Sequence, residues 1–146
     1  MFDATAGAAA GNASGYRASP TPALMSASIQ NALNIANGAD IAIVSSYIGA
    51  SSSTATMDAT VGLADLITGL QKAGTKVVLV SFANPYLSMG LPPTEANLIA
   101  WSASPLSQRA AARALLGRAS ITGKLPITIP GVAPFGAGVM RDVKRQ

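Results

Sequence analysis

The stretch Lys76-Val-Val-Leu-Val-Ser-Phe-Ala-Asn-Pro85 decides how the rest of the chain is organised. Residues 77–80 are four consecutive apolar β-formers, and they predict a strand buried on both faces, because a half-buried strand would alternate polar and apolar residues. Gly74 precedes the strand as a helix end, and Asn84-Pro85 follows it as a turn. A helix, a turn and a buried strand form half of a βαβ unit. Residues 84–93 therefore form the kind of loop in which open parallel sheets bind ligands.

Capping residues and apolar spacing place the other elements. Thr21-Pro22 and Ser104-Pro105 each combine a hydroxyl cap with Pro at the first helical position, and Asp58 is the expected cap of the helix between them. We expect helix ends near residues 37–38, 74 and 117, and strands at residues 41–44, 77–80, 97–101 and 125–129. The last strand should lie at a sheet edge, because Pro126 and Pro130 lack N–H donors.

The order of these elements predicts an α/β fold, a three-layer α/β/α sandwich with a largely parallel sheet. It leaves open whether a first βα unit is lacking. A length of 146 residues fits one domain. We assign residues 1–22 to an irregular lead-in, residues 23–140 to the α/β domain and residues 141–146 to a basic tail.

The composition narrows the classes of function. Charged residues make up 11% and hydrophobic residues 49% of the chain, which suits a domain partly covered by a partner or, equally, one rich in small residues. The net charge is +4, but the basic residues are scattered and aromatic residues are only 5%, so we expect no nucleic-acid partner. No apolar run approaches the roughly 20 residues of a membrane span, and we expect no membrane partner.

The reactive side chains do not form a complete catalytic set. The sequence contains no Cys and no His, which removes thiolate chemistry, the Ser-His-Asp triad and the commonest metal ligands. Glycoside hydrolysis needs two carboxylates that face each other. Of six acidic residues, only Glu95 is expected in a loop at the carboxyl edge of the sheet. We therefore predict no catalytic residue, metal site or cofactor in this chain.

Two further features have a functional and a structural interpretation. Residues 51–53, three serines, could bind an anion through their backbone N–H groups, but the glycines of a phosphate loop are absent, which favours a plain flexible loop. Trp101 and Tyr86 could stack on a sugar ring, although a buried Trp at a strand end is the preferred interpretation. The candidate residues for a substrate cleft are Ser51, Ser52, Asn84, Tyr86 and Glu95.

Several motifs occur in the order found in a known family. The segments are Ala39-Asp-Ile-Ala-Ile-Val44, Ser81-Phe-Ala-Asn-Pro-Tyr-Leu87, Leu98-Ile-Ala-Trp101, Ser107-Gln-Arg-Ala-Ala-Ala-Arg-Ala-Leu-Leu-Gly117, Ile121-Thr-Gly-Lys-Leu-Pro-Ile-Thr-Ile-Pro130 and Pro134-Phe-Gly-Ala-Gly138. Together they resemble the carboxyl-terminal α/β sandwich domain of glycoside hydrolase family 3. The resemblance covers residues 31–138, and it is specific because the motifs occur together and in order.

The resemblance implies a domain that follows a (β/α)8-type catalytic barrel, which carries the nucleophile in that family. In the β-glucosidase branch this second domain supplies an acid/base Glu from the loop after the Ala-Asp strand, whereas residues 48–56 here contain no carboxylate. The motifs look closer to the bacterial β-N-acetylhexosaminidase-like branch, in which a catalytically silent second domain is expected. Ala83 and Ala137 depart from the family pattern, which has Gly and His at these positions.

We therefore expect a non-catalytic domain that packs on a barrel, helps to shape a carbohydrate cleft and self-associates when isolated. The alternative is a stand-alone binding or scaffold module with the same fold, since a fold alone does not define a function.

Overall fold

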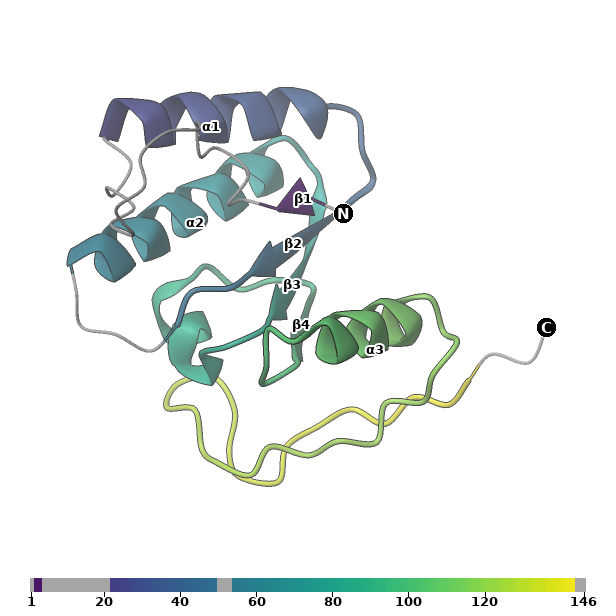
Figure 1. The fold of residues 1–146 in the computed structure, drawn as a ribbon. Coiled ribbons are helices and arrows are strands. Elements are labelled where there is room, and N and C mark those ends of the chain that lie inside the picture. The colour runs from purple at the N-terminus through teal and green to yellow at the C-terminus, as the bar shows by residue number, and fades with distance from the viewer. Residues whose placement is uncertain (1, 4–21, 50–53, 144–146) are drawn as a thin grey trace.

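The computed structural model describes residues 2–3, 22–49 and 54–143. Its elements are β1 (Phe2–Asp3), α1 (Pro22–Ile35), β2 (Ile41–Ser46), α2 (Thr54–Lys72), β3 (Lys76–Ser81), the 3-10 helix η1 (Pro85–Gly90), β4 (Ala96–Ile99) and α3 (Pro105–Leu115). The strands form one sheet in the order β1-β2-β3-β4, and every neighbouring pair is parallel. Helices α1 and α2 lie on one side of the sheet and α3 on the other (Figure 1). The predicted α/β/α sandwich with a parallel sheet is thus confirmed.

The core lies on both sides of β3. Val77 and Leu79 pack with residues of α2 on one side, and Val80 packs with Phe82 and Ala111 on the other. This burial on both faces confirms the interpretation of the apolar run at residues 77–80. Gly74 and Gly117 follow their helices with positive φ angles of 83° and 67°, and Ser104 Oγ accepts the Ser107 N–H at 3.2 Å, as capping rules predicted.

Strand β2 is less buried than its sequence predicted. Ile41 and Ile43 are exposed, and of the predicted stretch only Val44 is buried. The second core cluster gathers at the carboxyl half of the sheet, around Tyr47, Phe82 and Ala111. The part of this face that carries the amino half of β2 is therefore left uncovered by the residues described.

The structure differs from the sequence-based prediction at the start of α2 and at the amino terminus of the chain. Helix α2 begins at Thr54, so Asp58 lies one turn inside the helix and is not its cap. Residues 54–57 contain neither Gly nor Pro, so nothing in this segment stops the helix from beginning before Asp58. Phe2–Asp3 pair with Val44 and Ser45 as a short parallel strand, within the segment for which no strand was predicted.

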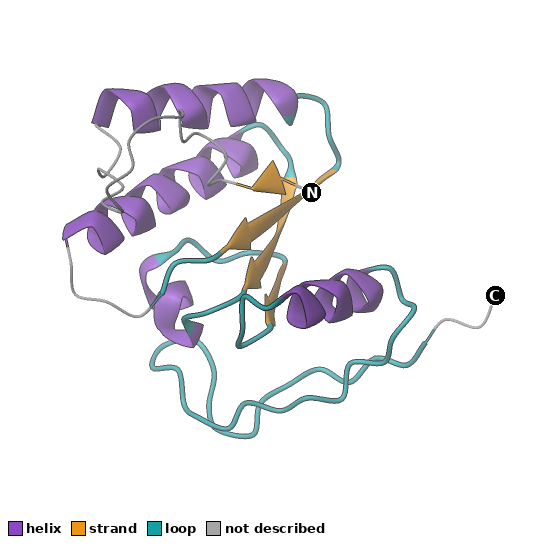
Figure 2. Ribbon diagram, viewed as in Figure 1, coloured by secondary structure: helices purple, strands orange, loops and turns teal. Residues whose placement is uncertain are grey.

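The predicted edge strand at residues 125–129 is wrong. This segment runs antiparallel to its own continuation and joins it through isolated bridges, Ile121 with Arg141 and Ile129 with Ala133, and through two bonds of 2.8 Å between Leu125 and residues 136–137. Pro126 and Pro130 each remove a donor, so a continuous ladder cannot form. Residues 120–143 form an extended arm without regular strands (Figure 2). Ile129, only 1% exposed, is its buried anchor.

Candidate functional site

The carboxyl edge of the sheet brings together three loops. Ser46, Ser81 and Ile99 are the last residues of β2, β3 and β4, and the register places them side by side. The segments that follow these strands are therefore neighbours, although they lie far apart in the sequence. Open parallel sheets bind ligands at this edge, so these loops form the candidate site.

The turn after β3 is held by a small hydrogen-bond network. Ser81 Oγ donates to the carbonyl of Asn84 at 3.0 Å, and Asn84 Oδ1 accepts the N–H of Tyr86 at 3.0 Å. Asn84 is thus the cap of η1, with Pro85 at the first helical position. Leu87 is buried and anchors η1 to the core. The carboxamide oxygen of Asn84 therefore positions η1, while its NH₂ group is left as a donor.

A shallow, open cleft of about 400 Å³ lies between η1 and α2. Its lining residues are Met57, Thr60, Val61, Ala64 and Asp65 from α2, and Asn84, Tyr86, Leu87 and Gly90 from the η1 segment. Tyr86 is 45% exposed in this lining. Apolar walls with a few polar groups are typical of sites for small molecules. The expected neighbours Asn84 and Tyr86 are therefore brought together at a concave surface.

Trp101 lies two residues beyond the end of β4 and has an unusual backbone conformation. It is the one non-glycine residue of the described ranges with a positive φ, 59°, and the Ser102 N–H donates to the carbonyl of Ala100 at 2.7 Å across it. This bond closes a γ-turn in a rare, strained form. The side chain is 44% exposed, so the preferred interpretation of a buried Trp is wrong. The turn directs the chain away from the sheet immediately after β4, which leaves the indole at the surface.

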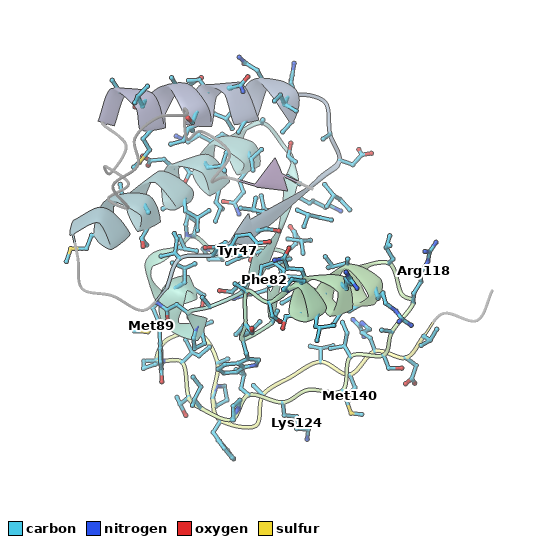
Figure 3. The ribbon with its side chains drawn as sticks, viewed as in Figure 1. Tyr47, Phe82, Met89, Arg118, Lys124 and Met140 are labelled. Atoms are coloured by element: carbon cyan, nitrogen blue, oxygen red, sulfur yellow. The ribbon has the colours of Figure 1, made fainter. Side chains whose placement is uncertain are left out.

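The loop after β2 begins on a rigid aromatic support. Tyr47 and Phe82 stack with ring centroids 4.8 Å apart and planes 9° apart (Figure 3). The Phe82 N–H also donates to the carbonyl of Ser46 at 2.9 Å. These contacts fix the start of the loop beside the turn after β3. The candidates Ser51 and Ser52 lie outside the described residues.

Glu95 lies at the other edge of the sheet. Its N–H donates to the carbonyl of Val77 at 2.9 Å, and the next residue, Ala96, pairs with Val78 near the amino end of β3. About four residues of strand, roughly 13 Å, separate the position of Glu95 beside β3 from the carboxyl edge. The expectation that Glu95 lies in a loop at the carboxyl edge of the sheet is therefore wrong. A chain that enters a strand parallel to its neighbour must first return to the amino edge.

The described carboxylates do not converge. Asp40 precedes β2, Asp142 lies in the arm, and Asp65 is the one acidic side chain among them that lines the cleft. Within residues 2–3, 22–49 and 54–143, no three acidic side chains gather as metal ligands would. A search of the same ranges found no helix long and apolar enough to cross a membrane. The cleft presents Tyr86, Asn84 and Asp65 to a ligand, but it offers no pair of facing carboxylates among the described side chains.

The α2 wall of the cleft could not be predicted from the sequence. Met57, Val61, Ala64 and Asp65 recur at helical spacing, but that spacing also fits a core-facing stripe. Met57 and Val61 are in fact exposed. Only the position of η1 across the helix distinguishes a face of α2 that lines a cleft from a face that packs in the core.

Comparison with known proteins identifies the family. The model of the glycosyl hydrolase family 3 C-terminal domain matches residues 3–138, from β1 to the closing Gly-Ala-Gly of the arm. Searches of curated proteins and of solved structures found no match to the chain. The match covers nearly the whole chain and includes every motif on which the resemblance was based. The chain therefore belongs to the family of glycosyl hydrolase family 3 C-terminal domains.

Proposed function

We propose that this chain is a non-catalytic domain that packs against a (β/α)8-type catalytic barrel and shapes its carbohydrate cleft with the loops of its carboxyl edge. The observation that carries the proposal is the pair of exposed aromatic residues, Tyr86 and Trp101, at that edge. Aromatic faces stack on the apolar faces of sugar rings, and their amphipathic rings suit a surface that is partly covered by a partner. Family membership supports the presence of a catalytic domain beside this one.

The absence of a carboxylate supports the type of enzyme that we propose. The segment of residues 48–56 contains no Asp or Glu that could act as acid/base. This composition fits a β-N-acetylhexosaminidase in which the barrel supplies both catalytic groups, better than a β-glucosidase in which the second domain supplies one. Ser51 and Ser52 of this segment remain candidates for hydrogen bonds to the sugar.

A stand-alone binding or scaffold module is the second candidate function. The exposed Ile41 and Ile43 favour a protein partner on the uncovered part of the sheet. Such a partner is compatible with the hydrolase assembly and with the stand-alone module. The two functions differ in what Tyr86 and Trp101 do. In a hydrolase assembly they contact the saccharide or the barrel, so their loss weakens the complex or its catalysis.

The test is a binding titration of the chain with a family 3 catalytic barrel, with and without N-acetylglucosamine oligomers. We expect a complex that Tyr86→Ala and Trp101→Ala weaken by about tenfold each, the effect of losing an interfacial aromatic residue. Ile35→Ala, which removes an exposed side chain from α1, is the matched control and should bind like the parent chain. Binding unaffected by both aromatic substitutions would favour the scaffold function.

A further inference from the structure

The outer face of α3 combines cations with large aliphatic side chains. Ala111 is buried against the sheet, and successive residues of an α-helix are rotated by about 100°. On this geometry Leu106, Arg109, Arg113 and Leu116 fall within an arc of about 80° directly opposite Ala111. All four are exposed, Leu106 by 75% and Leu116 by 66%. We call these four residues the α3 stripe.

Two further cations extend the α3 stripe. The Arg118 N–H donates to the carbonyl of Arg113 at 2.8 Å, and Ile121, three residues later, is bridged to Arg141 in the arm. Arg118 lies just beyond the carboxyl end of α3, and Lys124 and Met140 lie further along the arm (Figure 3). In the part of the chain that the structure describes, no ion pair or side-chain hydrogen bond engages these arginines. Their charge is therefore available to a partner.

The charge of the chain is divided unevenly. Residues 105–146 contain seven of the ten basic residues and one of the six acidic ones, a net charge of +6 against −2 for residues 1–104. The total of +4 thus hides a basic region, and its described part, residues 105–143, carries five basic residues and one acidic residue. A second copy would bring two such regions together, so self-association through this face is disfavoured.

We propose that the α3 stripe, with Arg118 and Arg141, binds the surface of an anionic lipid bilayer. Two arginines flanked on each side by an exposed leucine fit a membrane surface, where the cations meet phosphate groups and the aliphatic chains enter the headgroup boundary. Nucleic-acid sites instead combine cations with stacking aromatic residues, which the α3 stripe lacks. The outer side of a helix is also convex, and a bilayer needs no complementary groove. The expectation of no membrane partner considered only spanning segments, and the proposal involves surface binding alone.

Co-sedimentation with lipid vesicles tests the proposal. The chain should bind vesicles of mixed phosphatidylcholine and phosphatidylglycerol and leave pure phosphatidylcholine vesicles unbound. Each cation near an anionic leaflet strengthens binding about fivefold, so Arg109→Gln with Arg113→Gln should weaken it roughly 30-fold. Raising the salt from about 0.05 to 0.5 M should weaken binding at least tenfold, because the Debye length shortens.

Lys72→Gln with Lys76→Gln is the matched control. It removes the same charge from the exposed end of α2 and start of β3, and its binding should stay within about threefold of the parent chain. Leu106→Ser with Leu116→Ser keeps every charge and should weaken binding while leaving the salt dependence intact. Equal losses in the arginine and lysine variants would overturn the proposal. So would binding to poly-glutamate or RNA without binding to anionic vesicles.

Discussion

At the scale of single residues, Trp101 is the clearest sign of a functional constraint. A positive φ costs a residue with a side chain about 1–2 kcal/mol relative to glycine, and such strain persists where the surroundings or the function demand it. Trp101→Gly and Trp101→Ala both remove the indole, and only the Ala variant keeps the strain, which exceeds the effect of the greater entropy that Gly gives the unfolded chain. We expect the Gly variant to be more stable than the Ala variant by about 1 kcal/mol in urea titrations. An Ala variant of equal or higher stability would contradict the left-handed backbone at this position.

Ile129 is the residue that attaches the arm to the core. It is almost fully buried, whereas Ile127 is half-buried and Thr128 is exposed. Ile129→Ala should lower the free energy of unfolding by about 2–5 kcal/mol, and Ile127→Ala should cost about 1 kcal/mol. Thr128→Ala should cost about 1 kcal/mol, because Thr128 Oγ1 accepts the Phe135 N–H at 3.1 Å. Chemical denaturation gives the free energy of unfolding of the three variants. A larger loss for Ile127→Ala than for Ile129→Ala would contradict the role of Ile129 as the anchor of the arm.

At the scale of elements, local signals located the helix ends and the central strand well. Gly74 and Ser104 could be predicted because a cap depends on a few neighbouring residues. The arm could not, because the alternation of Leu125, Ile127 and Ile129 predicts an extended segment but not its partner. Glu95 was misplaced because the segment before β4 was assigned as a whole to the carboxyl edge, although a chain that enters a parallel strand must first return to the amino edge.

Gly74 allows a direct test of the end of α2. Its φ is 83°, and an added Cβ would meet nothing within 4 Å, so Gly74→Ala introduces backbone strain without a clash. We expect a loss of about 1 kcal/mol. Gly123→Ala, also in open space but without a positive φ, should change stability by about 0.5 kcal/mol or less. Equal effects of the two substitutions in thermal unfolding would rule out a left-handed end to α2.

At the scale of the whole molecule, the exposed apolar part of the sheet predicts association. Ile41 and Ile43 share the face of β2 that the second core cluster leaves open. Soluble proteins usually cover such surfaces. The isolated chain should form dimers or larger species in light scattering, and Ile41→Lys with Ile43→Lys should shift it to the monomer. Ile35→Lys, an equally exposed position on α1, should not. A monomeric parent chain at high concentration would contradict this expectation.

In the function that we propose, this domain assists a glycosidase without catalysing the reaction itself. The most direct measurement is the hydrolysis of aryl β-N-acetylglucosaminides and aryl β-glucosides by the purified chain, by a family 3 barrel and by both together. We predict no turnover by the chain alone, faster turnover by the pair than by the barrel, and loss of that gain in Trp101→Ala. Turnover by the isolated chain that disappears in Asp65→Asn or Glu95→Gln would contradict the account and make that carboxylate catalytic.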